Sequence, residues 1–131
     1  FEQSAEYFYK AEQKYKVNGI FLASIGIHES AWGTSKIASD KNNLFGFTAY
    51  DSDPYNSATS FDNYENAINK VAEVLSTKYL HVAGTKISDD LTATGTYFNG
   101  TTAKSVNVRY ASDTGWADKV FNYMQYLYGK L

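Results

Sequence analysis

The 131-residue sequence contains no cysteine, so disulfide bonds and thiolate catalysis are excluded. Its only histidines, His28 and His81, are too few for a zinc site without cysteine partners, and we expect no metal and no cofactor. Twelve Lys and Arg residues stand against 14 Asp and Glu residues, with the two signs interspersed, so a basic surface for nucleic acid is not expected. These absences argue against thiolate, metal and nucleic-acid chemistry.

A long hydrophobic run is also absent. The most apolar stretch, residues 20–27, is interrupted only by Ser24 and Gly26. It is too short to span a bilayer, which needs about 20 apolar residues. Because the stretch is apolar on nearly every side, it predicts a helix buried in a globular core. We therefore expect no membrane insertion.

Aromatic residues are abundant: they make up 17% of the chain and include 12 tyrosines. A tyrosine combines a flat apolar face with a hydroxyl group, which suits a sugar ring. Packing at the edges of the core is the alternative for most of them.

The periodicity of apolar residues predicts a mostly helical chain of one domain. The expected elements, in chain order, are helices over about 2–17 and from 18 or 19 to Glu29, a helical turn at 36–38, a β-hairpin or small β-lobe over 44–61, a helix over about 63–82, a polar loop over 84–102, a short helix or extended segment over 103–110, and a helix over 115–131. This order favours an α+β fold, mostly α. Because Phe1 begins inside a helical pattern, we expect residues 1–131 to be one domain excised from a larger secreted protein.

Glu29 follows directly on the buried run. Desolvation disfavours its anion, and so does the negative end of the helix dipole, so both effects raise its pKa. A carboxyl group that stays protonated near neutral pH is what a general acid for glycosidic cleavage requires. From burial alone, a structural carboxylate bonded to an arginine or a backbone amide is an equal alternative. Trp32 lies three positions on and either lines the same cleft or packs in the core.

Other catalytic motifs are missing. His28-Glu29 lacks the second histidine of H-E-x-x-H, because position 32 is tryptophan, and neither G-x-S-x-G nor a phosphate-binding loop occurs. A standard glycosidase needs a second carboxylate. The candidates downstream, each with turn or helix-capping chemistry as its alternative, are Asp51, Asp53, Asp62, Glu65 and Asp113.

Three blocks of sequence carry a family resemblance. They are H-E-S-A-W-G-T-S-K-I-A at 28–38, K-N-N-L-F-G-F-T-A-Y-D-S-D-P-Y at 41–55 and V-R-Y-A-S-D-x-x-W-A-D-K-V at 108–120. In this order and spacing they resemble the bacterial cell-wall N-acetylglucosaminidases of glycoside hydrolase family 73. The resemblance is closest to autolysin-type catalytic domains of Gram-positive bacteria and their phages, and it is weakest over residues 84–102.

The resemblance implies a lysozyme-like helical lobe, a small β-hairpin lobe and a cleft between them. Glu29 matches the family's general acid, and Tyr110 matches its active-site tyrosine. The residues expected to bind substrate are Trp32, Asn43, Phe45, Gly46, Phe47, Tyr50, Asp53, Tyr55 and Trp116, with core packing as the alternative for Trp116.

The implied substrate is peptidoglycan, cut after N-acetylglucosamine to leave reducing N-acetylglucosamine ends. We expect a monomer that is secreted to the bacterial cell wall, with wall-binding modules elsewhere in the parent chain. The alternatives are a lytic transglycosylase or muramidase on the same polymer, or a glycan-binding module without activity.

One departure from the family pattern concerns the second acid. Several members carry it as a glutamate in a longer β-hairpin, whereas residues 44–61 contain no glutamate. Asp62 and Asp51 are ranked together as the second catalytic carboxylate, ahead of Asp53. Attack by the substrate's own 2-acetamido group, with no protein nucleophile, also stays open.

Overall fold

The computed structural model describes residues 4–47 and 53–130, and it confirms an α+β fold that is mostly helical. Its elements are α1 (Ala5–Tyr15), α2 (Gly19–Ser30), α3 (Lys36–Lys41), α4 (Pro54–Ser57), α5 (Tyr64–Val74), the π-helix η2 (Leu75–Tyr79), β1 (Lys86–Ser88), β2 (Leu91–Thr92), α6 (Ala103–Tyr110) and α7 (Trp116–Tyr128).

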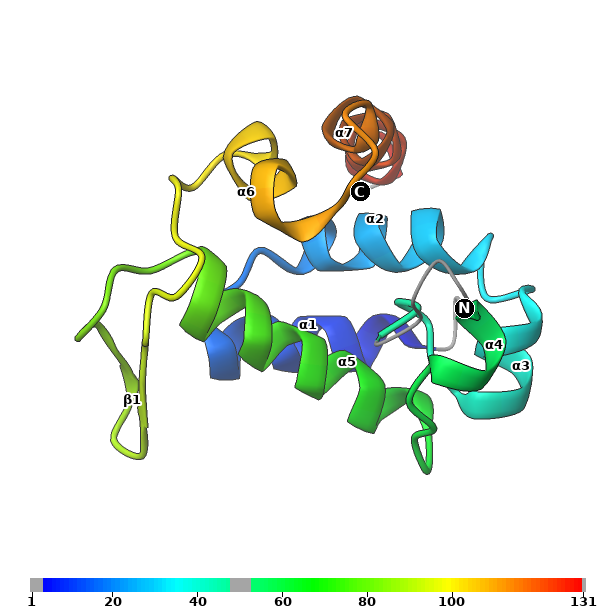
Figure 1. The fold of residues 1–131 in the computed structure, drawn as a ribbon, viewed down its shortest axis with the longest axis horizontal. Coiled ribbons are helices and arrows are strands. Elements are labelled where there is room, and N and C mark those ends of the chain that lie inside the picture. Colours follow the sequence, from blue (N-terminus) through cyan, green and yellow to red (C-terminus); the bar gives the residue numbers. More distant parts are fainter. Residues whose placement is uncertain (1–3, 48–52, 131) are drawn as a thin grey trace.

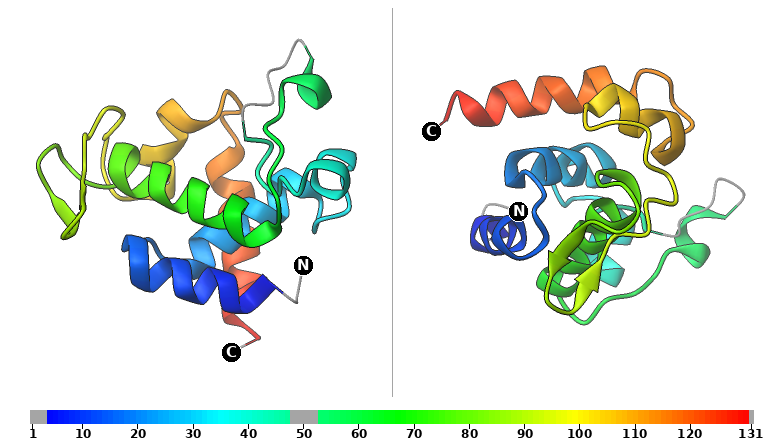
Figure 2. Two further views of the ribbon diagram at one scale, coloured as in Figure 1. Left: turned by 90° about the horizontal axis from the view of Figure 1, so that it is seen from below. Right: turned by 90° about the vertical axis from the view of Figure 1, so that its left-hand side faces the viewer.

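Helix α2 forms the middle tier of the fold. It packs against α7 on one side and against α1 on the other, while α1 also packs against α5 (Figures 1 and 2). Leu22 and Ile25 of α2 are completely buried, and most of their neighbours in the helix are buried too. The buried helix predicted from residues 20–27 is therefore confirmed. Asn18 starts it, because its side chain accepts a hydrogen bond from the Phe21 N–H at 2.9 Å.

The sheet lies in a different place from the one predicted. Strands β1 and β2 pair antiparallel between residues 86 and 92, within the segment predicted as a polar loop, and the hairpin projects at one end of the molecule (Figure 1). The clue is a short alternation, since Ile87 is buried between exposed Lys86 and Ser88. Strands of two or three residues are too short for periodicity to reveal.

The β-hairpin predicted over 44–61 is wrong for the described residues of that range. Pro54 instead opens the one-turn helix α4, because proline fixes φ and needs no N–H at the first helical position. The remaining residues are irregular and bond to α3. Lys41 Nζ donates to the Ala58 carbonyl at 3.0 Å, and Asn42 Nδ2 donates to the Phe61 carbonyl at 3.0 Å.

Asn43 fixes the path of this segment from the inside. It is 1% exposed, and its side chain makes four hydrogen bonds. Nδ2 donates to the carbonyls of Phe47 and Thr59, both at 3.0 Å, while Oδ1 accepts from the N–H groups of Phe45 and Phe47. The Asn43 side chain thus joins two backbone segments, which are also linked by the hydrogen bond from the Thr59 N–H to the Phe47 carbonyl at 2.9 Å.

The structure refines two other predicted elements. The helix predicted over 63–82 is α up to Val74 and then becomes the π-helix η2. The segment at 103–110, for which two conformations were open, is the helix α6. Within the described part of the chain, no helix is long and apolar enough to cross a membrane.

Replacing Asn43 by alanine should destabilise the fold by roughly 2–4 kcal/mol, because buried backbone groups lose their partners. Urea unfolding measures this change. The matched control is Asn122→Ala on the exposed face of α7, which should stay within about 0.5 kcal/mol of the parent. Equal stability of the two variants would contradict the structural role assigned to Asn43.

Candidate active site

Glu29 lies in the last turn of α2 and is half-buried. The indole Nε1–H of Trp116, the first residue of α7, donates a hydrogen bond of 2.9 Å to Glu29 Oε1. The partner of this carboxyl is therefore neither an arginine nor a backbone amide, the two partners expected for a structural carboxylate. A neutral donor adds no positive charge beside the carboxylate.

The pKa of Glu29 is raised above its ordinary value, and burial is the main cause. The negative charge of Asp113 raises it as well. The hydrogen bond from Trp116 and the charge of His28 act in the opposite direction without reversing the shift. The direction is the one expected for a carboxyl group that holds its proton as a general acid.

Strained backbone follows directly on Glu29's helix. Ala31, Trp32 and Gly33 have φ angles of 50°, 61° and 80°, so two non-glycine residues in succession are left-handed. Such a conformation is costly for a bulky residue. Ser30 helps to hold it, because its buried hydroxyl donates to the Gly26 carbonyl and accepts from the Gly33 N–H at 2.8 Å.

This turn places Trp32 at the surface. The side chain is 40% exposed, and its ring meets those of Tyr123 and Tyr126 edge-on, with centroids 6.0 and 5.7 Å away. Trp32 is therefore not packed in the core, which was the alternative for this residue.

Trp116 reaches Glu29 because the corner between α6 and α7 is fixed by Asn107. The buried Asn107 side chain donates to the Asp113 carbonyl at 2.9 Å and accepts from the Ala117 N–H at 3.0 Å. The Asp113 carboxylate in turn accepts from the Gly115 N–H and pairs with Lys119 at 2.6 Å. Asn107 was not predicted from the sequence. The only indication there is a polar side chain between two valines, in a segment that could have been either helical or extended.

A row of aromatic rings leads away from Glu29. Trp116 lies next to Tyr110, with centroids 5.2 Å apart; Tyr110 lies next to Tyr79 at 5.4 Å, and Tyr79 next to Tyr97 at 5.1 Å. We call Trp116, Tyr110, Tyr79 and Tyr97 the aromatic row. Burial raises the pKa of Tyr110 far above its ordinary value, and the charge of Glu29 adds to the shift, so its phenol keeps its proton.

The other predicted substrate-binding residues lie on the segment that follows α3. Asn43 and Phe45 are buried, Gly46 has a φ of 60°, and the half-buried Phe47 ring packs against that of Phe61. Asn43 and Phe45 thus support the segment from within. Tyr50 lies outside the described residues.

Tyr55, Asp53 and Asp62 lie farther along this segment. The Tyr55 hydroxyl donates to Asp40, and the Lys36 ammonium lies over its ring at 4.2 Å. Asp53 accepts from the Asn56 amide, while Asp62 is exposed. Asp51 lies outside the described residues. In the part of the chain that the structure describes, direct contact joins Glu29 to Trp116 and, through it, to Tyr110.

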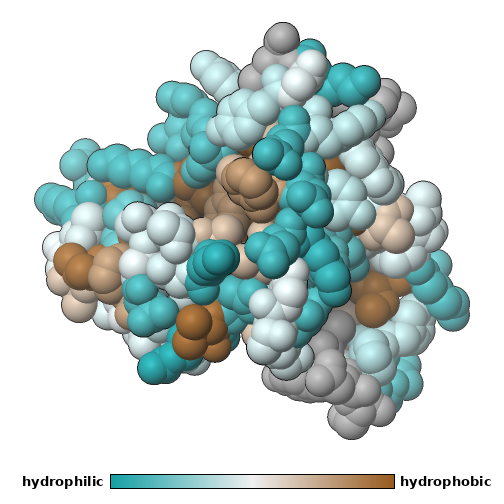
Figure 3. Space-filling model, turned by 90° about the horizontal axis from the view of Figure 1, so that it is seen from above, coloured by the Kyte–Doolittle hydropathy of each residue, from teal (hydrophilic) through white to brown (hydrophobic). Residues whose placement is uncertain are grey.

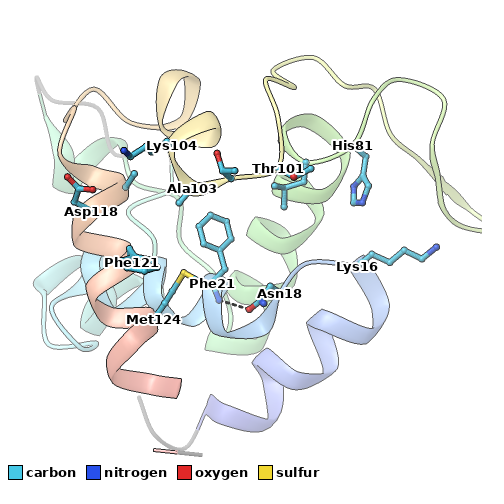
Figure 4. A pocket seen from close by; sticks show the side chains of 13 residues that line it. Lys16, Asn18, Phe21, His81, Thr101, Ala103, Lys104, Asp118, Phe121 and Met124 are labelled. Atoms are coloured by element: carbon cyan, nitrogen blue, oxygen red, sulfur yellow. Dashed lines mark hydrogen bonds between the residues drawn. The ribbon is translucent and has the colours of Figure 1, made fainter. Parts of the chain in front are cut away.

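A hollow of about 800 Å³ opens at the other end of α2 (Figure 4). It is lined by Lys16, Asn18, Phe21, Leu80, His81, Thr101, Thr102, Ala103, Lys104, Ala117, Asp118, Phe121 and Met124. On the face that carries α6 and α7, Figure 3 shows an apolar depression framed by hydrophilic side chains. None of the residues predicted for the site lines the hollow, although the ring of its lining residue Phe21 lies edge-on to that of Trp116, with centroids 6.3 Å apart. Over residues 4–47 and 53–130, no group of three or more His, Cys, Asp or Glu side chains is placed to hold a metal ion.

Comparison with known proteins gives a consistent result. Residues 5–129 match the family Glucosaminidase, described as mannosyl-glycoprotein endo-beta-N-acetylglucosaminidase. The chain is 37% identical over 130 residues to putative endo-beta-N-acetylglucosaminidases of Streptococcus pneumoniae strains TIGR4 and R6, covering 99% of the chain in both cases. It is 29% identical over 140 residues to a beta-N-acetylglucosaminidase of Bacillus subtilis strain 168, covering 97% of the chain. The match takes in 18%, 17% and 15% of the lengths of these three relatives.

The raised pKa of Glu29 makes folding stability depend on pH. The folded state binds more protons than the unfolded state between the ordinary value of 4.5 and the raised value. The free energy of unfolding contributed by Glu29 is therefore fully present below about pH 4.5 and is lost as pH rises through that window.

Urea unfolding of the parent and of Glu29→Gln at a series of pH values measures this dependence. Glutamine can still accept the bond from Trp116 but does not titrate, so the parent should lose stability relative to the variant as pH rises above about 4.5. A constant difference between the two proteins at all pH values would show that the pKa of Glu29 is not raised.

Proposed function

The chain belongs to the glucosaminidase family, and from this premise we propose that it hydrolyses the β-1,4 bond between N-acetylglucosamine and N-acetylmuramic acid in peptidoglycan, with Glu29 as the general acid. The observation that carries the proposal is the half-buried carboxyl of Glu29, whose pKa is raised by burial and whose partner is the neutral indole of Trp116.

In this mechanism, protonated Glu29 gives its proton to the glycosidic oxygen as the bond from that oxygen to the anomeric carbon of N-acetylglucosamine breaks. The N-acetylmuramic acid side leaves as an alcohol, and water supplies the hydroxyl group of the new reducing end. Positive charge develops on the sugar in the transition state. A carboxyl group held protonated until that moment and ionised afterwards is suited to this step.

Three arrangements complete the reaction, and the anomer formed first separates one of them from the other two. If Asp62 or Asp51 activates the attacking water, the configuration at the anomeric carbon is inverted. If one of these carboxylates attacks that carbon and water then displaces it, or if the 2-acetamido group of the substrate attacks and water opens the resulting ring, the configuration is retained. Asp113 is less suited to either role, because Lys119 and the Gly115 N–H already occupy its carboxylate.

Tyr110 is proposed to contact the reacting sugar. Its phenol keeps its proton, so it can donate a hydrogen bond to the substrate, and its ring lies against Trp116, which holds Glu29. The role is one of positioning and charge stabilisation, since the raised pKa makes the phenol a poor proton source.

Peptidoglycan as the substrate rests on the resemblance of the three sequence blocks to cell-wall enzymes. We propose that the domain acts as a monomer outside the bacterial cell, within a longer chain whose other modules bind the wall. The much greater length of the relatives is consistent with such modules.

Product analysis tests the reaction. Digestion of purified peptidoglycan, followed by borohydride reduction and mass spectrometry, should give reduced N-acetylglucosamine ends. Glu29→Gln keeps the shape but not the proton, so it should lower kcat by roughly 10²–10⁴-fold while glycan binding is retained.

The alternatives give other results. Anhydromuramic ends would indicate a lytic transglycosylase, reduced N-acetylmuramic acid ends a muramidase, and binding without new ends a glycan-binding module. Unchanged turnover of Glu29→Gln would refute Glu29 as the acid.

Tyr110→Phe separates the hydroxyl group from the ring. It keeps the contact with Trp116 but removes the hydrogen-bond donor, so kcat should fall roughly tenfold to a hundredfold, as for a lost bond to a developing charge. Steady-state kinetics and thermal unfolding measure both effects. A fall in melting temperature without a fall in kcat would make Tyr110 a packing residue only.

A further inference from the structure

The aromatic row does not end at the catalytic residues. From Trp116, which is 1% exposed, it passes through the half-buried rings of Tyr110 and Tyr79 to Tyr97, which is 39% exposed. The rings of Tyr79 and Tyr97 are tilted by 34° relative to each other, with centroids 5.1 Å apart. The row therefore runs without a gap from the partner of Glu29 to the protein surface.

The loop that carries Tyr97 is held by the π-helix η2. The N–H groups of Thr94 and Gly95 both donate to the Thr77 carbonyl at 2.9 Å, and the Tyr97 N–H donates to the Lys78 carbonyl at 2.8 Å. Since η2 also supplies Tyr79, one irregular turn of helix places both rings. Wider helical turns of this kind occur often at functional sites.

Glycine at position 95 is required for this attachment. Its φ is +62°, and a Cβ atom there would lie 2.5 Å from the backbone nitrogen of Ala83. The loop can approach the Ala83 backbone only without a side chain. Tyr97 is thus exposed yet fixed in place, so a ligand would not have to order it on binding.

The stretch of sequence that carries Tyr97 has no charged side chain. Residues 91–103 contain no Asp, Glu, Lys or Arg, and they include hydroxyl and amide side chains such as those of Thr94, Thr96 and Asn99. The hydroxyl groups of Thr94 and Thr96 lie 2.8 Å apart. A flat ring among neutral hydroxyl groups matches a pyranose, which presents an apolar C–H face and a rim of hydroxyl and amide groups.

We propose that Tyr97, supported by Tyr79, forms a glycan-binding subsite in which a sugar ring remote from the cleaved bond stacks on the Tyr97 ring. The inference rests on the proposed function, since it assigns the row to the same glycan strand that Glu29 cleaves. The subsite takes an N-acetylhexosamine residue of that strand. Binding energy gained there positions the strand and makes the enzyme prefer long glycans to short ones.

Kinetics on glycans of two lengths test the subsite. The substrates are uncrosslinked glycan strands of alternating N-acetylglucosamine and N-acetylmuramic acid, as long strands and as tetrasaccharides. Tyr97→Ala should raise KM about tenfold for long strands with little change in kcat. The same variant should leave the parameters for the tetrasaccharide near those of the parent.

Three further variants separate stacking from folding. Tyr97→Phe keeps the ring and should stay within about threefold of the parent in KM, a difference of about 0.6 kcal/mol. Tyr97→Leu keeps apolar packing on Tyr79 but removes the flat ring. It should therefore raise KM for long strands about tenfold, even if the alanine variant folds poorly. Tyr9→Ala removes an equally large ring that is 62% exposed on α1, and it should match the parent.

Direct binding keeps this test independent of catalysis. The dissociation constant of long strands, measured by calorimetry in the Glu29→Gln background, should rise about tenfold when Tyr97→Leu is added. Parent-like KM and dissociation constants for Tyr97→Leu would overturn the subsite while leaving the proposed hydrolysis intact. If the parent releases no reducing ends but binding still depends on Tyr97, the proposed hydrolysis fails and the subsite stands.

Discussion

The hydrogen bond from the Trp116 indole to Glu29 is the interaction on which the candidate site depends. It joins residues 87 positions apart in the chain, and it exists only because α7 packs across α2. A buried carboxyl needs a partner, and the kind of partner decides its chemistry. An arginine would have held the anion, whereas an indole satisfies one oxygen without adding a charge, so burial still raises the pKa.

Several parts of the fold serve to hold that pair. Asn107 fixes the corner between α6 and α7 by accepting from the Ala117 N–H, and this sets where α7 begins. The turn after α2 holds Ala31 and Trp32 in the left-handed region, a cost that the hydrogen bonds of Ser30 help to offset. After α3 in the chain, Asn43 holds the irregular segment to which several predicted substrate-binding residues belong.

Prediction from sequence succeeded where a signal was long or chemically distinctive. The apolar run at 20–27 predicted the central helix, and helical periodicity predicted α1, α7 and the combined length of α5 and η2 within a few residues. It failed where elements are short. Alternation around 55–61 suggested strands, but Pro54 starts a helical turn there, and the strands at 86–92 are too brief to show a period.

The sequence by itself determined that a buried helix ends close to Glu29 and that three blocks resemble a glycosidase family. Both can be read locally, because an apolar run marks a buried helix and motifs are read in order. The sequence also predicted a raised pKa for Glu29, but it left a structural carboxylate as an equal alternative. Only the tertiary structure decided that Trp116 is the partner of Glu29, that Asn107 positions it, and that Tyr110, Tyr79 and Tyr97 continue from it as one row. Those contacts join α2, η2, α6, α7 and a loop, and the distances between such elements are set by packing, which leaves no periodic trace in the chain.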